Sequence, residues 1–441
     1  MLLRYGRKAF TSRIALTELA EKTLDVQYYI WEDDATGHIF SQRLLKAADR
    51  GVRVRVLLDD INFQGRDENI AALDAHPNVE IRLFNPFAHR SARALDFIAD
   101  FGRVNHRMHN KLIVMDNALA IVGGRNIGNH YFQVDSHANF RDLDIVAAGP
   151  IVPEISDVFD YFFNGEWSVP IAALVDRERT PEDLARTRSA LEEKIAGEDY
   201  PHPLDQDVDE LSSEIVDILE GLVWAPGRII WDDPKTIQET GSTSRMQEAL
   251  ARRAKRLEKE LLIESAYLVM RDHGVNSIRE LSERGVRVRI LTNSLVSNDV
   301  LAAHAGYAER RKQMIEAGAE LYELKPDART VKQRAANETS KAALHTKAIA
   351  FDRKDVFIGS YNLDPRSGDI NTEAGLYVES AELAQQLKDF MDDGVTMQDS
   401  YRVTLDEEGQ LLWTTEENGE QVYYHKDPES NWWQRFQSGF I

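Results

Sequence analysis

The chain has 441 residues, a formal charge of −21 at neutral pH and no cysteine. Its length indicates more than one domain, and its mixture of hydrophobic and charged residues is typical of a globular protein. The missing cysteines exclude a disulfide framework, a thiolate metal site and a cysteine nucleophile, but leave the redox compartment undecided. A surface this acidic repels phosphate backbones, which disfavours sequence-independent nucleic-acid binding without excluding a local basic cleft.

The sequence shows no membrane span and no secretion signal. No run of residues approaches the roughly 18 apolar residues that a transmembrane helix needs. The opening MLLRYGRKAF lacks an apolar stretch before its charges, so no signal peptide is expected. The chain opens directly into a helical pattern, and we expect any leader or anchor to lie upstream of it.

The first part of the chain alternates helices with strands. In chain order the pattern predicts a helix, a strand, a helix, a strand, a helix, a strand and a last apolar strand, at 13–23, 24–31, 37–49, 50–60, 67–76, 79–85 and 108–115. Strands separated by helices of about a dozen residues favour βαβ units. We therefore predict an α/β fold with a mostly parallel sheet flanked by helices on both faces.

The same order of elements returns later in the chain. The stretch RGVRVRVLLDD at 50–60 recurs as RGVRVRILTNS at 284–294, and similar elements surround both copies in the same order, in the second copy at 244–258, 261–268 and 274–284 before it and at 303–317 and 319–325 after it. A repeat of this length indicates a duplicated structural unit. We predict two similar domains related by a pseudo-two-fold axis.

The predicted domains occupy residues 1–165 and 241–400. The segment 166–240 between them carries thirteen acidic and three basic side chains from Glu182 to Glu220, which favours a solvated, acidic helical connector. In the tail, 401–441, apolar and polar residues alternate around EEG and ENG. This pattern predicts two tight hairpins in an antiparallel meander, followed by a short helix near NWWQRF.

A polar motif occurs once in each half. MHNKLIVMDNALAIVGGRN at 108–126 and LHTKAIAFDRKDVFIGSYN at 344–362 share five polar or small residues at one constant offset, namely His109, Lys111, Asp116, Gly123 and Asn126, and His345, Lys347, Asp352, Gly359 and Asn362. On a strand, the histidine and the lysine two places later share a face. The second apolar run of each motif should pair with the first, and the small residues should let a ligand approach the backbone.

This combination of side chains suits a phosphodiester. Two facing halves would bring together two imidazoles, two ammonium groups and two carboxamides. One imidazole can attack phosphorus while the other protonates the departing oxygen. The lysines and asparagines can neutralise the non-bridging oxygens, so neither a metal ion nor a cofactor is expected.

The carboxylates of the region divide into two groups. Asp116 and Asp352 have the opposite strand parity to their histidines, and we expect them to fix a turn through backbone amides. A second group could orient the imidazoles by accepting from the non-reacting ring nitrogen. Its candidates are Asp142 or Asp144 and Glu373.

The paired H-x-K-x4-D…G-[GS]-x-N pattern resembles the signature of the phospholipase D superfamily over residues 8–400. Stretches such as LDVQYYIW and MHNKLIVMDN…IVGGRNIG resemble its bacterial cardiolipin synthase C-type branch. The resemblance implies metal-free, two-step transfer through a phosphohistidine, with catalytic residues His109, Lys111, Asn126, His345, Lys347 and Asn362. It also implies that His109 is the nucleophile and His345 the acid and base.

The branch further implies a cardiolipin-forming phosphatidyltransferase at the bacterial cell membrane. The donor would be phosphatidylethanolamine or phosphatidylglycerol, and the acceptor phosphatidylglycerol. The protein would bind the membrane surface peripherally, without nucleic acid, although the membrane-targeting region of the family is not visible in this chain. Whether a partner protein is required stays open.

Two other classes of function remain as alternatives. One is a hydrolytic phosphodiesterase, either a phospholipase D or a nuclease, and the acidic charge counts against the nuclease. The other is a non-catalytic membrane scaffold, which the two intact motifs disfavour. The sequence does not decide between transfer and hydrolysis.

Several other residues allow two interpretations each. A metal cluster of histidines is disfavoured because no carboxylate or cysteine accompanies them at ligand spacing; its members would be His106, His109, His130 and His137. Aromatic residues at strand ends could pack in the core or line a substrate mouth, namely Tyr28, Tyr29, Trp31 and Tyr267. The amphipathic segment 84–106 and the pair Trp432–Trp433 could contact an anionic bilayer or pack against the protein.

Overall fold

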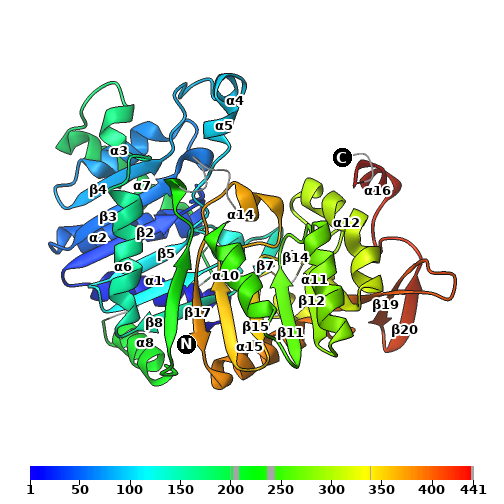
Figure 1. The fold of residues 1–441 in the computed structure, drawn as a ribbon. Coiled ribbons are helices and arrows are strands. Elements are labelled where there is room, and N and C mark those ends of the chain that lie inside the picture. Colours follow the sequence, from blue (N-terminus) through cyan, green and yellow to red (C-terminus); the bar gives the residue numbers. More distant parts are fainter. Residues whose placement is uncertain (199, 202–207, 236–243, 338, 439–441) are drawn as a thin grey trace.

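The computed structural model describes residues 1–198, 200–201, 208–235, 244–337 and 339–438. Two α/β halves lie side by side, the first on the left of Figure 1 and the second on the right. Each half contains one large sheet with helices packed against it. The histidine motifs lie in the strands that meet between the halves.

The first sheet has eight strands in the order β1-β8-β6-β5-β2-β3-β4-β9. Their bounds, in that order, are Leu2–Leu3, Asp144–Ala148, Leu119–Gly123, Leu112–Met115, Thr23–Tyr28, Arg53–Asp59, Val79–Phe84 and Ser168–Pro170. One face packs against α1 (Gly6–Leu19), α2 (Ala35–Asp49) and α3 (Asp67–Asp74) in a large apolar cluster.

The second sheet has ten strands in the order β10-β17-β16-β15-β11-β12-β13-β18-β19-β20. Their bounds, in that order, are Gly227–Trp231, Ala374–Glu379, Asp355–Gly359, Lys347–Phe351, Glu260–Ser265, Arg287–Asn293, Ala319–Leu324, Ser400–Leu405, Leu411–Glu417 and Glu420–Tyr424. Helices α10 (Arg245–Ala254), α11 (Asp272–Glu283) and α12 (Leu301–Glu316) contribute to its apolar cluster.

The strand order confirms the predicted duplication. The run β8-β6-β5-β2-β3-β4 of the first sheet corresponds to β17-β16-β15-β11-β12-β13 of the second. The α/β class and the two similar units are therefore as predicted. The expectation of mostly parallel sheets was wrong, because in the described residues the parallel pairs within the two large sheets are confined to β2-β3-β4 and β11-β12-β13.

In each histidine motif, two strands pair antiparallel because a short turn connects them. The turn between β5 and β6 has positive φ at Asp116 and Asn117, and the turn between β15 and β16 repeats this at Asp352 and Arg353. Two consecutive residues in the left-handed region are typical of a type I′ turn, which joins antiparallel neighbours. The repeated motif therefore forms a β-hairpin in each half.

The two halves share structure at their boundary. Strand β7 (Ala138–Arg141) of the first half pairs in parallel with β14 (Lys341–Leu344) of the second. One apolar cluster combines residues of both large sheets with α6 (Ile151–Phe163) and α15 (Ala381–Gly394). The boundary is thus a packed core rather than an open seam.

The segment predicted as a solvated connector, 166–240, packs closely where it is described. Helix α7 (Pro181–Gly197) contacts α2 and α3, and α8 (Val208–Glu220) contacts α1. Burial of Leu191, Leu211 and Ile218 anchors these helices, while most of their acidic side chains are exposed. At its ends, β9 joins the first sheet and β10 joins the second.

The C-terminal tail forms the predicted antiparallel meander, β18-β19-β20. Strand β18 also pairs with β13, so the tail extends the second sheet. The short helix near NWWQRF is α16 (Trp432–Ser438), and both of its tryptophans are exposed. Core closure by this pair is therefore not observed.

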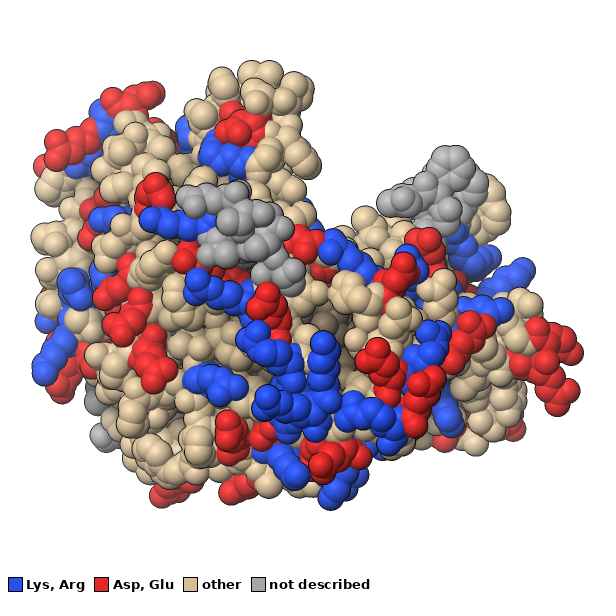
Figure 2. Space-filling model, in the orientation of Figure 1, with Lys and Arg blue, Asp and Glu red and all other residues tan. Residues whose placement is uncertain are grey.

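Charge is unevenly distributed over the surface. Figure 2 shows lysine and arginine side chains gathered over α10 and α11, in spite of the strongly acidic total. The projection formed by α4 (Ala94–Ala99) and α5 (Phe101–Val104) is largely uncharged in the same view. None of the helices in the described part of the chain is long and apolar enough to cross a bilayer.

Candidate active site

Both motif histidines lie at the boundary between the halves. His109 comes just before β5, and its amide donates to the Thr372 carbonyl of the second half at 2.9 Å. His345 lies between β14 and β15, and its amide donates to the Arg141 carbonyl of the first half at 2.8 Å. Each histidine backbone is thus held by the opposite half.

The imidazoles are oriented by carboxylates that also come from the opposite half. Nδ1 of His109 lies 2.8 Å from Oε2 of Glu373, and Nδ1 of His345 lies 2.6 Å from Oδ2 of Asp142. A carboxylate that accepts from Nδ1 fixes the tautomer in which Nε2 carries the free lone pair. Each half therefore supplies the carboxylate that sets the tautomer of the other half's histidine, and Nε2 of both imidazoles is left as the reacting atom.

Burial controls the charge state of these pairs. Desolvation lowers the pKa of His109 and of His345 well below the ordinary value, and the charges of Lys111 and Lys347 lower both further. Desolvation also raises the pKa of Glu373 to about 7. Both shifts favour the neutral form of the imidazoles, and a bound anion would favour the imidazolium form.

The two lysines form a buried cationic centre. Lys111 and Lys347 each donate to the backbone carbonyl of their own motif histidine, and neither forms a salt bridge with any described carboxylate. Desolvation lowers the pKa of Lys347 to about 8 and that of Lys111 well below the ordinary lysine value. Their Nζ atoms lie near the rings of Tyr29 and Tyr267. An anionic ligand would relieve the cost of burying both charges.

The asparagines flank the same centre, but their partners differ. Asn126 accepts from the Ile30 amide at 3.2 Å and donates to the Tyr131 hydroxyl at 2.8 Å. The side-chain oxygen of Asn362 is buried and has no hydrogen-bond partner among the described residues. This carboxamide therefore retains hydrogen-bonding capacity for a ligand.

The motif aspartates have a structural position. Asp116 accepts from the backbone amides of residues 21–23, where β2 begins, at 2.8–2.9 Å. Asp352 accepts in the same way from residues 258–260, where β11 begins. Both carboxylates thus connect the hairpin turn to the neighbouring strand and lie away from the imidazoles.

Of the two candidates near His345, only Asp142 reaches the imidazole. Asp144 forms salt bridges with Arg13 and Arg125 at 3.0 and 3.1 Å, inside the first half. The two residues separate because they occupy different elements: Asp144 begins β8, whereas Asp142 precedes it beside the other half.

Two glycines of the motifs allow close packing of neighbouring protein atoms, which the sequence did not predict. A Cβ atom added at Gly124 would lie 2.4 Å from Asp142 Oδ1, and one added at Gly359 would lie 2.5 Å from the Ala374 carbonyl oxygen. The freed space is filled by the neighbouring strand and by the orienting carboxylate. These two glycines thus make room for protein atoms, and the approach of a ligand to the backbone here stays a prediction.

The comparisons with known proteins agree with this geometry. The model of the family described as "Cardiolipin synthase, PLD-like domain" matches residues 14–166 and 250–393, which contain both motifs. Cardiolipin synthase C of Escherichia coli (strain K12) is 39% identical over 438 residues, which span 97% of this chain and 91% of that protein. The chain belongs to the cardiolipin synthase family of phospholipase D-like proteins.

The chain is also similar to a second cardiolipin synthase and to one solved structure. A cardiolipin synthase of Geobacillus kaustophilus (strain HTA426) is 26% identical over 400 residues, which cover 89% of this chain and 65% of that protein. The crystal structure of phosphatidylserine synthase from Haemophilus influenzae Rd KW20 has a TM-score of 0.60 at 16% identity, covering 89% of this chain and 85% of that chain. This second likeness is one of fold.

In this cardiolipin synthase family member, several contacts of the imidazoles were missed by the sequence reasoning. The Phe140 ring stacks on His345 at 5.0 Å between centroids, and Tyr131 meets the same imidazole edge-on. The hydroxyls of Ser360 and Ser367 donate to Glu373. The one available signal was the position of Phe140, two residues before Asp142 on the same extended stretch.

The other predicted candidates lie in different surroundings. Nδ1 of His106 contacts the Ile370 carbonyl oxygen at 2.7 Å, and His130 packs on Tyr131 and Phe140. In the described part of the chain, no three histidine or carboxylate side chains are grouped as metal ligands. Among the early aromatics, Tyr28 bonds to Arg13 in the core, whereas Tyr29 lies edge-on to His109 at 4.9 Å.

Proposed function

We propose that this protein is a phosphatidyltransferase that forms cardiolipin from phosphatidylglycerol and a phospholipid donor, through a phosphohistidine. The observation that carries the proposal is the reciprocal pair of His109–Glu373 and His345–Asp142, with two buried lysines beside it. Family membership and the 39% identity to cardiolipin synthase C support the choice of lipid substrates. The donor is phosphatidylethanolamine or phosphatidylglycerol.

The first step exchanges one P–O bond for a P–N bond. Nε2 of His109 attacks phosphorus with its lone pair, because Glu373 accepts the proton of Nδ1. The head-group oxygen leaves with the electrons of its bond to phosphorus and takes a proton from Nε2 of His345. The head group departs as a neutral alcohol, and the phosphatidyl group stays on His109.

The second step reverses these roles with a different alcohol. The primary hydroxyl of phosphatidylglycerol gives its proton to Nε2 of His345 and attacks phosphorus. The P–N bond breaks, and its electrons return to Nε2 of His109. Both imidazoles recover their starting states, so the cycle consumes no other reactant.

The buried lysines and asparagines stabilise the transition state of both steps. Negative charge grows on the non-bridging oxygens when phosphorus becomes five-coordinate. Lys111, Lys347 and the unpartnered carboxamide of Asn362 face that charge without having to leave a carboxylate partner first. The same anion supports the proton on His345 that the first step needs.

Peripheral contact with the bacterial membrane is part of the proposal. The segment 84–106, which allowed two interpretations, exposes a group of large apolar side chains on α4 and α5: Leu95, Phe97, Ile98 and Phe101. Ile98 is 83% exposed and Phe101 58% exposed. Arg90 and Arg93, which precede α4, pair with Asp60 and so fix the projection formed by α4 and α5 to the domain. An apolar projection on a rigid base suits insertion among lipid head groups.

Product analysis tests transfer against hydrolysis. The protein is incubated with vesicles that contain labelled phosphatidylethanolamine and excess phosphatidylglycerol, and the labelled lipids are separated. We expect cardiolipin as the main labelled product, and no turnover by His109→Ala. If labelled phosphatidic acid dominates while phosphatidylglycerol is abundant, the protein is a hydrolase of the same superfamily.

A further inference from the structure

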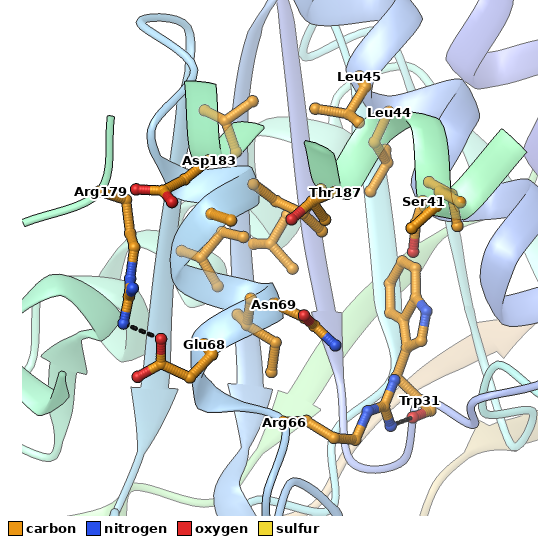
Figure 3. A pocket seen from close by; sticks show the side chains of 18 of the residues that line it. Trp31, Ser41, Leu44, Leu45, Arg66, Glu68, Asn69, Arg179, Asp183 and Thr187 are labelled. Carbon is orange, nitrogen blue, oxygen red and sulfur yellow. Dashed lines mark hydrogen bonds and ion pairs between the residues drawn. The ribbon is translucent and has the colours of Figure 1, made fainter. Parts of the chain in front are cut away.

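A separate cavity lies within the first half, away from the motif histidines. Its volume is about 420 Å³, which is in the range of small-molecule binding sites. It is enclosed by one face of β3 and β4 and by α2, α3 and α7 (Figure 3). None of the predicted catalytic residues lines it.

The walls of this cavity, named here the α7 cavity, are apolar. Side chains from every enclosing element line it, including Leu44, Val56, Ile70, Ile81 and Leu191. Apart from the charged side chains, the polar lining residues are His38, Ser41, Asn69 and Thr187, so most of the wall offers no hydrogen-bond partner to a ligand. Its depths suit a hydrocarbon chain.

The charged side chains that line the α7 cavity are mostly basic. Five basic and three acidic side chains are among its lining residues, namely Arg66, Arg177, Arg179, Arg186 and Lys194, and Asp33, Glu68 and Asp183. This local excess of positive charge stands out in a chain whose total charge is −21. A ligand with an anionic end is favoured there over a cationic one.

Two of these arginines have unused hydrogen-bonding capacity. Arg66 donates to the Trp31 carbonyl at 2.6 Å, and no carboxylate of the described residues forms a salt bridge with it. Arg179 pairs with Glu68 through one terminal nitrogen, yet its Nε has no partner in the described part of the chain. The Arg179 side chain is only 7% exposed. Figure 3 shows Arg66 beside Trp31 at one end of the cavity and Arg179 at another.

We propose that the α7 cavity binds one fatty acyl chain whose anionic head group is held by Arg66. The chain occupies the space between β3, β4 and α7, and the head group receives the hydrogen bonds that Arg66 does not use within the protein. Burial lowers the pKa of Arg66 although the charges of Asp33, Glu32 and Asp34 raise it, and an anionic head group would stabilise its charge further. The site binds a lipid independently of phosphatidyl transfer.

Binding is measured with the full chain carrying His109→Ala and His345→Ala, so that no turnover can occur. The probes are laurate, dodecylammonium and lysophosphatidylglycerol, each below its micellar concentration, in isothermal titration calorimetry. We expect one laurate or lysophosphatidylglycerol per chain, and binding of dodecylammonium at least tenfold weaker. Tighter binding of laurate would identify a free fatty acid as the source of the chain, and tighter binding of lysophosphatidylglycerol a phospholipid.

Two filling variants and two matched controls locate the probe. Thr187→Phe on α7 and Ser41→Phe on α2 fill the cavity from two different helices and should abolish binding. Ser277→Phe, which fills a cavity of the second half, should leave it unchanged. Arg66→Gln should weaken laurate binding at least tenfold. Arg186→Gln should weaken it much less, because the Arg186 side chain is already paired with Asp183.

The outcomes separate this site from the proposed function. The proposal is overturned if laurate does not bind. It is also overturned if both filling variants bind laurate as the parent does, once thermal unfolding has shown that they are folded. Loss of binding in Ser277→Phe alone places the chain in the other cavity and overturns it as well. Because the histidine variants are inactive, these results do not depend on whether the protein transfers or hydrolyses.

Discussion

Replacement of Glu373 by glutamine tests the reciprocal exchange of side chains at the active site. Glu373 is buried, accepts from the hydroxyls of Ser360 and Ser367, and lies 2.8 Å from Nδ1 of His109. Glutamine has nearly the same shape, but its amide group can donate to Nδ1. His109 then adopts the tautomer whose Nε2 carries a proton and cannot attack phosphorus.

The size of the effect follows from the lost interaction. A hydrogen bond to a charged group contributes about 1.5–3 kcal/mol. If the imidazole loses this amount in the transition state, kcat falls roughly 10- to 150-fold. Although the variant loses activity, its free energy of unfolding should exceed that of the wild type at neutral pH. Burial raises the pKa of Glu373 to about 7, so ionisation of this carboxyl lowers the free energy of unfolding of the wild type as the pH rises from 4.5 through 7. The uncharged glutamine avoids that cost.

The assay compares two donors. One is a phospholipid, and the other is a phosphodiester with a nitrophenol leaving group, which departs without a proton. Glu373→Gln should slow both, because both need His109 as nucleophile. Asp142→Asn, which disturbs His345, should slow the nitrophenyl donor less. The matched control is Glu379→Gln at the exposed end of β17, the strand that directly follows Glu373. Wild-type kcat in a folded Glu373→Gln variant would refute the reasoning.

Three further predictions concern the turn, the cationic centre and the membrane. Asp352→Ala removes three hydrogen bonds from backbone amides and should lower the free energy of unfolding by about 3 kcal/mol, measured by denaturant titration, while the folded fraction keeps its kcat; a normal stability would contradict this. Because burial lowers the pKa of Lys347 to about 8, kcat/KM should fall above about pH 8, which is well below the pKa of an ordinary lysine side chain. A kcat/KM that stays constant up to pH 10 would contradict this. Ile98→Asp with Phe101→Asp should reduce sedimentation with anionic vesicles at least tenfold but leave turnover of the soluble nitrophenyl donor intact; unchanged sedimentation would remove α4 and α5 from the membrane contact.

The duplication could be predicted from the sequence because it rests on local patterns. Two copies of RGVRVR and of the histidine motif lie at nearly constant offsets, and the alternation of helices and strands is visible within each copy. The turn position of Asp116 followed from strand parity. Each of these inferences uses residues that are close in the chain.

The exchange of carboxylates between the halves could not be predicted in the same way. Glu373 lies 264 positions from His109, and Asp142 lies 203 positions from His345. Their meeting depends on how two sheets pack around a shared core, which no local pattern encodes. For the same reason, the sequence could name both Asp142 and Asp144 as candidates without choosing between them.

Two other predictions were wrong because one local pattern in the sequence was outweighed by another. The apolar strands at 108–124 suggested a parallel sheet, but a two-residue turn forces them into an antiparallel hairpin. The acidic residues of 166–240 suggested a solvated connector, whereas a few buried leucine and isoleucine side chains decide where α7 and α8 pack. Charge counts describe the exposed face of a helix and say little about the buried one.

The central claim is that His109 becomes covalently bound to phosphorus while His345 moves protons. It is tested most directly by mass spectrometry of the His345→Ala variant after incubation with the nitrophenyl phosphodiester. That donor needs no acid to leave, whereas the second step lacks its base, so the intermediate should accumulate. We predict a phosphorus adduct on His109 of this variant and none on the His109→Ala variant. An adduct mapped to His345 in the His109→Ala variant, with none on His109, would contradict the account.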